Sequence, residues 1–421
     1  MALEQVFEYP RTLAKLRGGP LGWLLENFCD WLLKRGFTRC TVRRHLCYVS
    51  HLNTWLAEEG WRWTGQLSAK DVGNFHTSYR LWCRNRGPLE KHLREVRYSI
   101  SRFCEFLKVK GIFDPMVSSP LYQPLLEGYL AWMRDHQHAD EGTLKGHRHK
   151  VQQFLEWLGS AATAEGLSDL SANSIESFFL DYASDKGHAT RRLMRSALRT
   201  FLRFCLYEGY IPHHLDHAVP PLRTYKLARV PRGLSERQAQ TVLQAVDRYT
   251  KVGLRDYAIL TLLHTYGVRG GQVRALQLDD IHWSHDQILF RAMKGGKDSL
   301  LPLTPEVGES LIDYLRNARP SSSFREVFMT SRAPYHPMWN SSVLSSLVQR
   351  HILTAGINPP NKGSHVFRHA FATRMVADGH PFKAVADVLG HRYLSSTFIY
   401  TKVDFNALSQ VALEWPGEVG S

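Results

Sequence analysis

The sequence predicts a mainly helical protein, with two tandem four-helix bundles followed by an α+β domain that contains a small antiparallel sheet. Three observations predict this architecture: an internal repeat in the first half, apolar residues spaced three and four apart along much of the chain, and one short strand pair near residues 287–303. The 421 residues are enough for roughly two to four domains, each with a core of its own.

The repeat covers about the first 210 residues. Residues 24–31 match residues 125–132 at an offset of 101, and Leu67-Ser68-Ala69 returns as Leu170-Ser171-Ala172 at an offset of 103. A near-constant offset across a whole module indicates the duplication of one fold.

Each copy is expected to contain about four helices. In the last helix of the second copy, the apolar residues Leu198, Phe201 and Leu202 recur at helical spacing. The hydroxyls of Ser68 and Ser171 are expected to cap one helix in each copy. Four tryptophans of the repeat are interpreted as core residues: Trp31, Trp55, Trp132 and Trp157.

The charge of the chain favours an anionic partner. Lys and Arg outnumber Asp and Glu by 53 to 39, which gives a net charge of +14. Such an excess favours nucleic acid or an anionic surface. Residues 1–120 carry a net charge of +8. Three arginines of this segment are DNA-binding candidates: Arg39, Arg43 and Arg44.

The second copy is nearly neutral but carries a basic ridge. Arg191, Arg195 and Arg199 follow one another at spacings of four, and Arg192 and Arg203 lie beside them. Apolar residues are expected on the other side of this helix: Leu193, Ala197, Leu198 and Phe201. A basic ridge on an amphipathic helix suits a phosphate backbone, and a solvated helix face is the alternative.

The sequence excludes several other classes of protein. No apolar run approaches the roughly 18 residues of a membrane helix, and the N-terminus does not resemble a secretory signal. All six cysteines lie in the first half and none forms a CxxC pair, so we expect free buried thiols in a reducing compartment. A cytoplasmic protein without membrane contact is predicted.

Two proline-rich stretches, residues 111–124 and 212–231, are interpreted as linkers because proline blocks helix continuation. After the second stretch, Ser235 and Gln238 form a capping box that opens a new helix. The expected organisation is an extra N-terminal helical DNA-binding domain at 1–115, a helical domain at 120–215, a linker at 216–231 and a third domain at 232–421.

The third domain is expected to start with helices, one of which includes Asp256 to Tyr266. Two strands, Gln287 to Met293 and Ser299 to Leu303, are expected to form a hairpin whose turn is Lys294 to Asp298. Helical segments account for the remainder of the domain.

This domain contains polar residues that a purely structural domain would not need. His365 and Arg368 are spaced i, i+3 and therefore share one helix face. Arginine presents a planar fork to phosphate oxygens, lysine can protonate a leaving alkoxide, and tyrosine can act as a covalent nucleophile. The set provides the groups for phosphoryl transfer without a metal: Arg269, Lys294, His365, Arg368, His391 and Tyr400.

These positions resemble the tyrosine recombinase (phage integrase) family, and the resemblance covers the third domain nearly end to end. Tyr-Gly-Val-Arg269 is similar to the family's Thr-Gly-Leu-Arg, and Met-Lys294-Gly-Gly-Lys297 is similar to its Gly-Lys-Gly-x-Lys hairpin. His365-Val-Phe-Arg368-His369 matches His-x-x-Arg-His, and Leu-Gly-His391 followed by Tyr400 completes the set. Both N-terminal repeats resemble the family's SAM-like core-binding domain, of which most members carry only one copy.

The resemblance implies a mechanism. Tyr400 would attack a DNA phosphodiester and form a 3′-phosphotyrosine, while Arg269 and Arg368 hold the non-bridging oxygens. His365 would accept the tyrosine proton, Lys294 would protonate the departing 5′-oxygen, and His391 would bind the scissile phosphate. Lys297 is the alternative to Lys294 and is otherwise a DNA-binding candidate.

Three departures from the family pattern concern the chemistry. Gln272 stands where the family has an acid, so a neutral amide would have to support the neighbouring cations. Gly270 and Gly271 are expected to mark a helix start or a close approach of the backbone to DNA. Ser299 replaces an arginine of the hairpin. Arg274 is interpreted as a solvent-facing helix residue.

The implied partners are double-stranded DNA with inverted sites and a homotetramer on that DNA, alone or with other recombinases. Residues 405–413 are expected to form a tail helix that docks on a neighbouring protomer or on its own domain.

A type IB topoisomerase and a DNA-binding protein with a decayed site remain alternatives. No cofactor is expected. Three histidine clusters, around His136, His147 and His214, are interpreted as lacking cysteine or carboxylate partners at ligand spacing, so no metal site is predicted.

Overall fold

The structure is a computed structural model that describes residues 1–83, 90–115, 119–222, 233–293, 298–361, 363–390 and 397. By its internal contacts the chain divides into two compact units. One comprises residues 1–63, 88–106 and 227–421, and the other comprises residues 64–87 and 107–226. None of the helices in the described ranges is long and apolar enough to cross a membrane. The predicted domain boundaries stay predictions.

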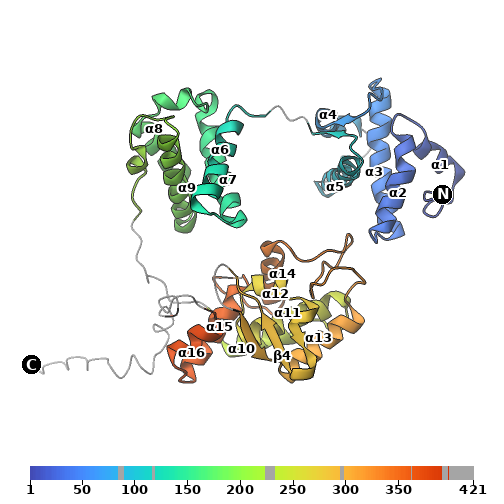
Figure 1. Cartoon of the computed structure of the whole chain (residues 1–421). Coiled ribbons are helices and arrows are strands. Elements are labelled where there is room, and N and C mark those ends of the chain that lie inside the picture. Colours follow the sequence, from blue (N-terminus) through green and yellow to red (C-terminus); the bar gives the residue numbers. More distant parts are fainter. Residues whose placement is uncertain are drawn as a thin grey trace, which may run out of the picture. The chain divides into compact units, whose positions relative to one another are not determined.

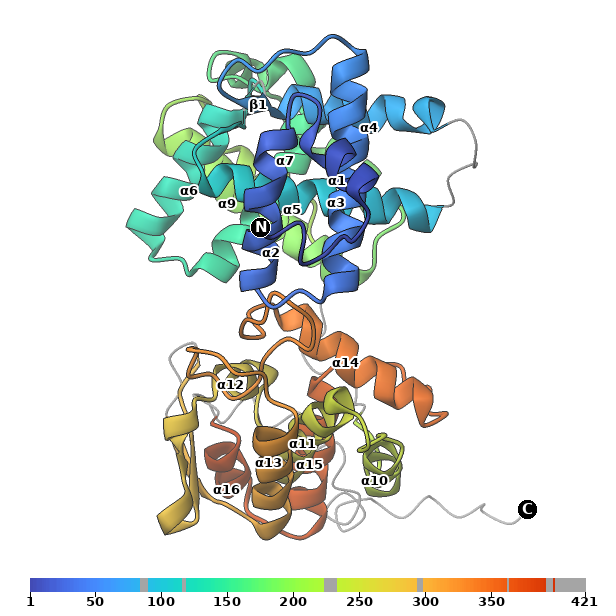
Figure 2. The same cartoon turned by 90° about the vertical axis from the view of Figure 1, so that its right-hand side faces the viewer.

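The N-terminal part of the first unit is helical. It contains α1 (Pro10–Arg17), α2 (Gly22–Lys34), α3 (Arg39–Glu58) and most of α5 (Glu90–Val109). Helices α1, α2 and α3 pack against one another (Figures 1 and 2). The Phe28 ring of α2 contacts Phe103 and Phe106 of α5 at centroid distances of 5.0 and 5.5 Å. These apolar contacts join helices that are distant in sequence into one core.

The second unit is built around α6 (Gln123–Gln137), α7 (Glu141–Leu158), α8 (Ala172–Ala183) and α9 (His188–Tyr207), which share one apolar core (Figure 1). The short helices η1 (Gly159–Ala161), η2 (Gly166–Asp169) and η3 (Leu215–Ala218) connect and follow them. The same unit holds α4 (Ala69–Trp82) and a parallel pair of two-residue strands, β1 (Leu67–Ser68) and β2 (Phe113–Asp114).

The predicted helix caps are confirmed. Ser68 accepts a hydrogen bond from the Asp71 amide at 3.1 Å, and Ser171 accepts one from the Ser174 amide at 3.1 Å. Capping is a local interaction, so the sequence alone was sufficient to locate the starts of these helices.

Three predictions about burial need correction. Trp31 and Trp55 are buried and Trp132 is partly buried, but Trp157 is 42% exposed although its ring contacts Phe154 and Phe178. Leu193 is exposed since it follows Arg192 on the solvent side of α9. The six cysteines are free, yet two of them are exposed and one is only partly buried: Cys40, Cys47 and Cys83.

The C-terminal part of the first unit combines helices with one sheet. Its helices are α10 (Glu236–Gln244), α11 (Lys251–Tyr266), α12 (Gly270–Ala275), η4 (Leu278–Asp280), η5 (Trp283–His285), α13 (Pro305–Asn317), α14 (Ser341–Thr354), α15 (His365–Ala377) and α16 (Phe382–Val388). Helix α11 is the central element, because it contacts α10, α12, α13 and α15 (Figure 2). The capping box of Ser235 and Gln238 opens α10, as predicted.

The sheet is antiparallel, with strand order β3 (Ile281–His282), β4 (Gln287–Phe290) and β5 (Ser299–Pro302). The predicted hairpin is therefore present, but β3 was not predicted and β4 ends three residues early. Beyond β4 the Arg291 side chain turns to Asp280, with Nε 2.9 Å from Oδ1. The Ala292 amide donates to Asp298 at 2.6 Å, so side-chain contacts replace the strand ladder there. Four residues of the predicted turn, 294–297, lie outside the described residues.

Candidate active site

The first candidate arginine lies directly after the central helix. Helix α11 ends at Tyr266, and Gly267 follows with a φ of +59°. Only glycine adopts this left-handed conformation readily, which makes Gly267 a typical helix stop. A Cβ atom at Gly267 would also lie 2.6 Å from the Phe371 ring, so the glycine lets α15 approach the end of α11. Arg269 then precedes α12.

The second arginine comes from α15 and is only 4% exposed. Arg368 Nη1 donates to the Gly267 carbonyl at 3.0 Å, and Nη2 donates to the Leu389 carbonyl at 2.7 Å. The guanidinium therefore joins the end of α11 to the segment after α16. His365 lies one turn earlier on α15 and is exposed.

The two arginines converge on the same carbonyl oxygen. Arg269 Nη1 donates to Leu389 O at 3.4 Å and to Gly390 O at 3.2 Å. Leu389 O thus receives hydrogen bonds from both guanidinium groups, although the two arginines are about 100 residues apart in the sequence. An oxygen that carries negative charge would be bound still more strongly at such a position. Gly390 directly precedes His391 in the sequence.

The pKa of His365 is lowered from the ordinary value of 6.5, because the ring is partly desolvated and because the Arg368 and Arg269 guanidinium groups disfavour a third positive charge. Desolvation likewise lowers the pKa of His369, together with the nearby His365 and Arg368. His365 is therefore neutral at pH 7 and can accept a proton.

The glycines after Arg269 mark a helix start, as predicted, since α12 begins at Gly270. Their lack of a side chain also permits close packing inside the protein. A Cβ at Gly270 would lie 2.7 Å from Leu344, and one at Gly271 would lie 2.9 Å from Met293. A close approach to DNA stays a prediction.

Gln272 is buried and binds the backbone. Its Oε1 accepts a hydrogen bond from the Arg269 amide at 3.0 Å, and its Nε2 donates to the Arg291 carbonyl at 3.3 Å. Gln272 therefore supports the neighbouring cation Arg269, as expected, by holding its main chain in place.

The interpretation of Arg274 as a solvent-facing residue is wrong. Its Nη1 donates to the Met338 carbonyl at 3.1 Å and also to the Trp339 carbonyl. Desolvation lowers the pKa of this guanidinium. Arg274 thereby ties α12 to the segment that leads into α14, over a sequence separation that no local pattern reveals.

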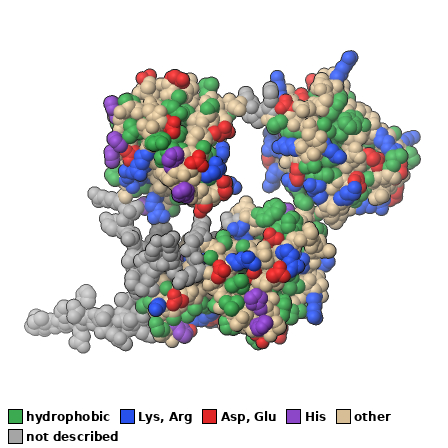
Figure 3. All heavy atoms as spheres, viewed as in Figure 1, with side chains coloured by type: hydrophobic (Ala, Val, Ile, Leu, Met, Phe, Trp, Pro, Cys, Tyr) green, Lys and Arg blue, Asp and Glu red, His purple; other side chains and the backbone are tan. Residues whose placement is uncertain are grey.

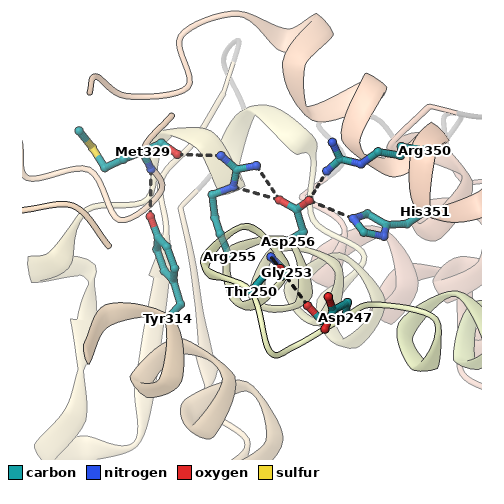
Figure 4. Close-up of polar contacts among 9 residues, drawn as sticks. All are labelled: Asp247, Thr250, Gly253, Arg255, Asp256, Tyr314, Met329, Arg350 and His351. Carbon is teal, nitrogen blue, oxygen red and sulfur yellow. Dashed lines mark hydrogen bonds and ion pairs between the residues drawn. The ribbon is translucent and has the colours of Figure 1, made fainter. Parts of the chain in front are cut away.

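An ionic network around a buried carboxylate was not predicted. Figure 4 shows Arg255, Arg350 and His351 around the Asp256 carboxylate, which is fully buried. Arg255 Nη2 and His351 Nε2 lie 2.7 and 2.9 Å from its oxygens, and Arg350 also binds it. Arg255 Nη1 donates to the Met329 carbonyl at 3.2 Å. The network joins α11 to α14. The sequence feature that could have revealed it is the Arg255-Asp256 pair near the start of an apolar helix.

Comparisons with known proteins identify the family. Residues 232–407 match the model of the phage integrase family, and residues 126–209 match that of the phage integrase N-terminal SAM-like domain. A putative integrase/recombinase of Sinorhizobium fredii, y4rA, is 31% identical over 414 residues, which covers 97% of both chains. The chain belongs to the phage integrase family of tyrosine recombinases.

Further relatives agree with this membership. Tyrosine recombinase XerD of Ralstonia nicotianae is 30% identical over 268 residues, which covers 62% of this chain and 83% of that protein. The structure of a lambda integrase(75-356) dimer bound to a COC′ core site matches with a TM-score of 0.53 at 18% identity, over 70% of this chain and 99% of that one. The recombinase therefore shares the fold of these enzymes.

Three candidate catalytic residues of the recombinase, Lys294, His391 and Tyr400, lie outside the described residues, as do Lys297 and the predicted tail helix at 405–413. Of the predicted catalytic set, the structure brings together Arg269, Arg368 and, one turn away, His365. Ser299 is the first residue of β5.

The DNA-binding candidates of the recombinase lie on helices and are partly engaged within the protein. On α3, Arg39 donates to Glu8 at 2.9 Å and Arg43 to the Val6 carbonyl at 2.6 Å, while Arg44 lies 3.8 Å from Glu95. All three side chains remain about half exposed.

On α9, Arg191, Arg195 and Arg199 of the basic ridge are partly buried, whereas Arg192 and Arg203 beside them are exposed. Arg191 donates to the Lys186 carbonyl at 2.7 Å, and Arg199 lies 3.3 Å from Asp216. DNA contact by these residues stays a prediction.

The argument against a metal near His214 needs correction. Asp216 lies between His214 and His217, and one ligand atom of each residue lies within 4.8 Å of the others. This carboxylate stands only two residues after His214 and directly before His217.

Proposed function

We propose that this recombinase cleaves and rejoins double-stranded DNA at specific sites through a 3′-phosphotyrosine intermediate, in the cytoplasm. The observation that carries the proposal is the convergence of Arg269 and Arg368 on one oxygen acceptor, in a chain whose family consists of tyrosine recombinases. Two guanidinium groups at one point suit the charge that develops on a phosphate under attack.

In the proposed cleavage step, the Tyr400 hydroxyl attacks the phosphorus and the bond from phosphorus to the 5′-oxygen breaks. His365 accepts the phenolic proton, and Lys294 gives a proton to the departing 5′-oxygen. His391 binds the scissile phosphate next to the arginines. Because the phosphotyrosine bond conserves the free energy of the phosphodiester, the 5′-hydroxyl of a second strand can reverse the step without ATP or a metal.

The proposed DNA target consists of inverted sites occupied by a homotetramer, alone or with other recombinases. A solved structure with the same fold, at a TM-score of 0.54, is described as a lambda integrase tetramer bound to a Holliday junction. We assign residues 232–421 to catalysis, with a tail helix at 405–413, and residues 120–215 to DNA binding around the core site, joined by a linker at 216–231. Residues 1–115 supply a further DNA-binding module.

A nicked suicide substrate tests the nucleophile. The full chain should form a covalent protein–DNA product that denaturing gels resolve, and Tyr400→Phe should abolish it because phenylalanine has no hydroxyl to attack phosphorus. Tyr249→Phe is the matched control, since Tyr249 is fully exposed in the same part of the chain. Trapping by Tyr400→Phe at the level of the unmodified chain would exclude Tyr400 as the nucleophile.

A further inference from the structure

A separate group of polar side chains lies at η3, the short helix that follows α9 in the second unit. His214, Asp216 and His217 each offer one ligand atom there, and the three atoms lie within 4.8 Å of one another. Among the described residues, no other His, Cys, Asp and Glu side chains form such a group. Figure 3 shows histidine side chains at the surface of this bundle, together with Lys and Arg.

The carboxylate of Asp216 is held in a fixed orientation. Its Oδ2 accepts hydrogen bonds from Arg199 Nη2 at 3.3 Å and from Arg203 Nε at 3.1 Å. The residue is only 3% exposed. Both arginines lie on α9, so the helix determines where the second oxygen, Oδ1, points.

Oδ1 faces the two histidines. His214 Nδ1 and His217 Nε2 each lie 3.8 Å from it, and their side chains are 72% and 74% exposed. A separation of 3.8 Å is too long for a hydrogen bond. It is close to the roughly 3.3–3.5 Å that separates two ligands of one tetrahedral zinc ion with bonds of about 2.0–2.2 Å. Small rotations of the exposed imidazoles would remove the difference.

We propose that His214, Asp216 and His217 bind a divalent transition-metal ion of the zinc type, with water or an anionic oxygen completing the coordination. Two imidazoles and one carboxylate suit zinc, nickel or copper better than magnesium or calcium, which prefer oxygen ligands alone. The Arg199 and Arg203 guanidinium groups repel a dication, so the site should be weaker than a four-ligand structural zinc site. The same groups attract an anion to the open coordination position.

The test uses the full chain and two ions, Zn²⁺ by calorimetry and Co²⁺ by visible absorption. The variant His214→Ala with His217→Ala removes two ligands but keeps the contacts of Asp216 with the arginines, so the fold is preserved. His213→Ala is the matched control, because it removes the adjacent histidine, which is not part of the group. We expect the double variant to bind Zn²⁺ at this site more than about tenfold more weakly and to lose the Co²⁺ absorption band. The control should retain both the Zn²⁺ affinity and the Co²⁺ band.

Equal ion binding by the double variant and the unmodified chain would overturn the proposal, and so would an equal loss in the control. A second measurement addresses DNA. If these histidines contact DNA phosphates directly, the double variant will weaken DNA binding equally with and without a chelator while its Zn²⁺ binding is unchanged. That result would also contradict a metal site.

Discussion

At the scale of single residues, the site depends on one carbonyl group. Leu389 O accepts from Arg368 at 2.7 Å and from Arg269 at 3.4 Å, and the two arginines come from segments about 100 residues apart. The motifs that contain the arginines were evident in the sequence, because residue types and spacing suffice to recognise them. Leu389 was not, because a backbone acceptor carries no sequence signal. The same holds for Arg274, whose acceptors are the carbonyls of Met338 and Trp339.

The lowered pKa of His365 predicts a pH dependence of cleavage. Desolvation and the neighbouring guanidinium groups lower the pKa below 6.5, so the neutral, proton-accepting ring predominates at pH 7 and is lost as pH falls through the lowered value. The rate should therefore be flat near neutral pH and should decline only in acid. Single-turnover cleavage of a suicide substrate between about pH 5 and 8 measures this acid limb.

Two variants assign the limb to one histidine. His365→Gln should cleave slowly and without the acid limb, whereas His369→Gln should keep it, although the pKa of His369 is lowered as well. An acid limb that persists in His365→Gln would show that another group accepts the proton.

At the scale of elements, features set by residues close in sequence were predicted correctly, whereas features set by residues distant in sequence were missed. The caps at Ser68, Ser171 and Ser235 were predicted because a hydroxyl and the next turn of backbone suffice to form them. Strand β3 was missed because two residues carry no periodicity. The exposure of Trp157 was missed because how much of a ring its neighbours cover depends on tertiary packing, here against Phe178 of α8.

The Asp256 network makes a prediction for the packing of α11 on α14. Asp256→Asn removes a fully buried charge and leaves Arg255, Arg350 and His351 without their counter-ion. Breaking a buried ion pair in this way costs about 3–5 kcal/mol. Hydrogen exchange of the α11 amides should show a loss of opening free energy of that order. Asp313→Asn is the control, since Asp313 forms a surface pair with Arg248 at 3.0 Å and should cost less than about 1 kcal/mol. Equal protection of α11 in both variants would contradict a supporting role for the network.

At the scale of the whole molecule, the segment before the two family matches requires an explanation. The family models cover residues 126–209 and 232–407, whereas y4rA aligns over 97% of this chain. The alignment with that relative therefore includes the N-terminal segment. The sequence repeat, with α1 to α5 in the first segment and α6 to α9 in the second, favours a second module of the same kind, and this duplication stays a prediction.

The charge of this segment predicts what it contributes to DNA binding. Residues 1–120 carry a net charge of +8, and each phosphate contact adds about 0.9 to the slope of log affinity against log salt. Deleting residues 1–115 should therefore shorten the protected footprint on DNA and flatten the salt dependence. Arg44→Glu in the full chain tests the same surface without removing the module, because Arg44 is about half exposed and its ion pair with Glu95 is long, at 3.8 Å. That variant should weaken DNA binding and reduce the salt-dependence slope by the amount that about one or two phosphate contacts contribute. A footprint and slope that are unchanged in both proteins would mean that the module contacts proteins instead of DNA.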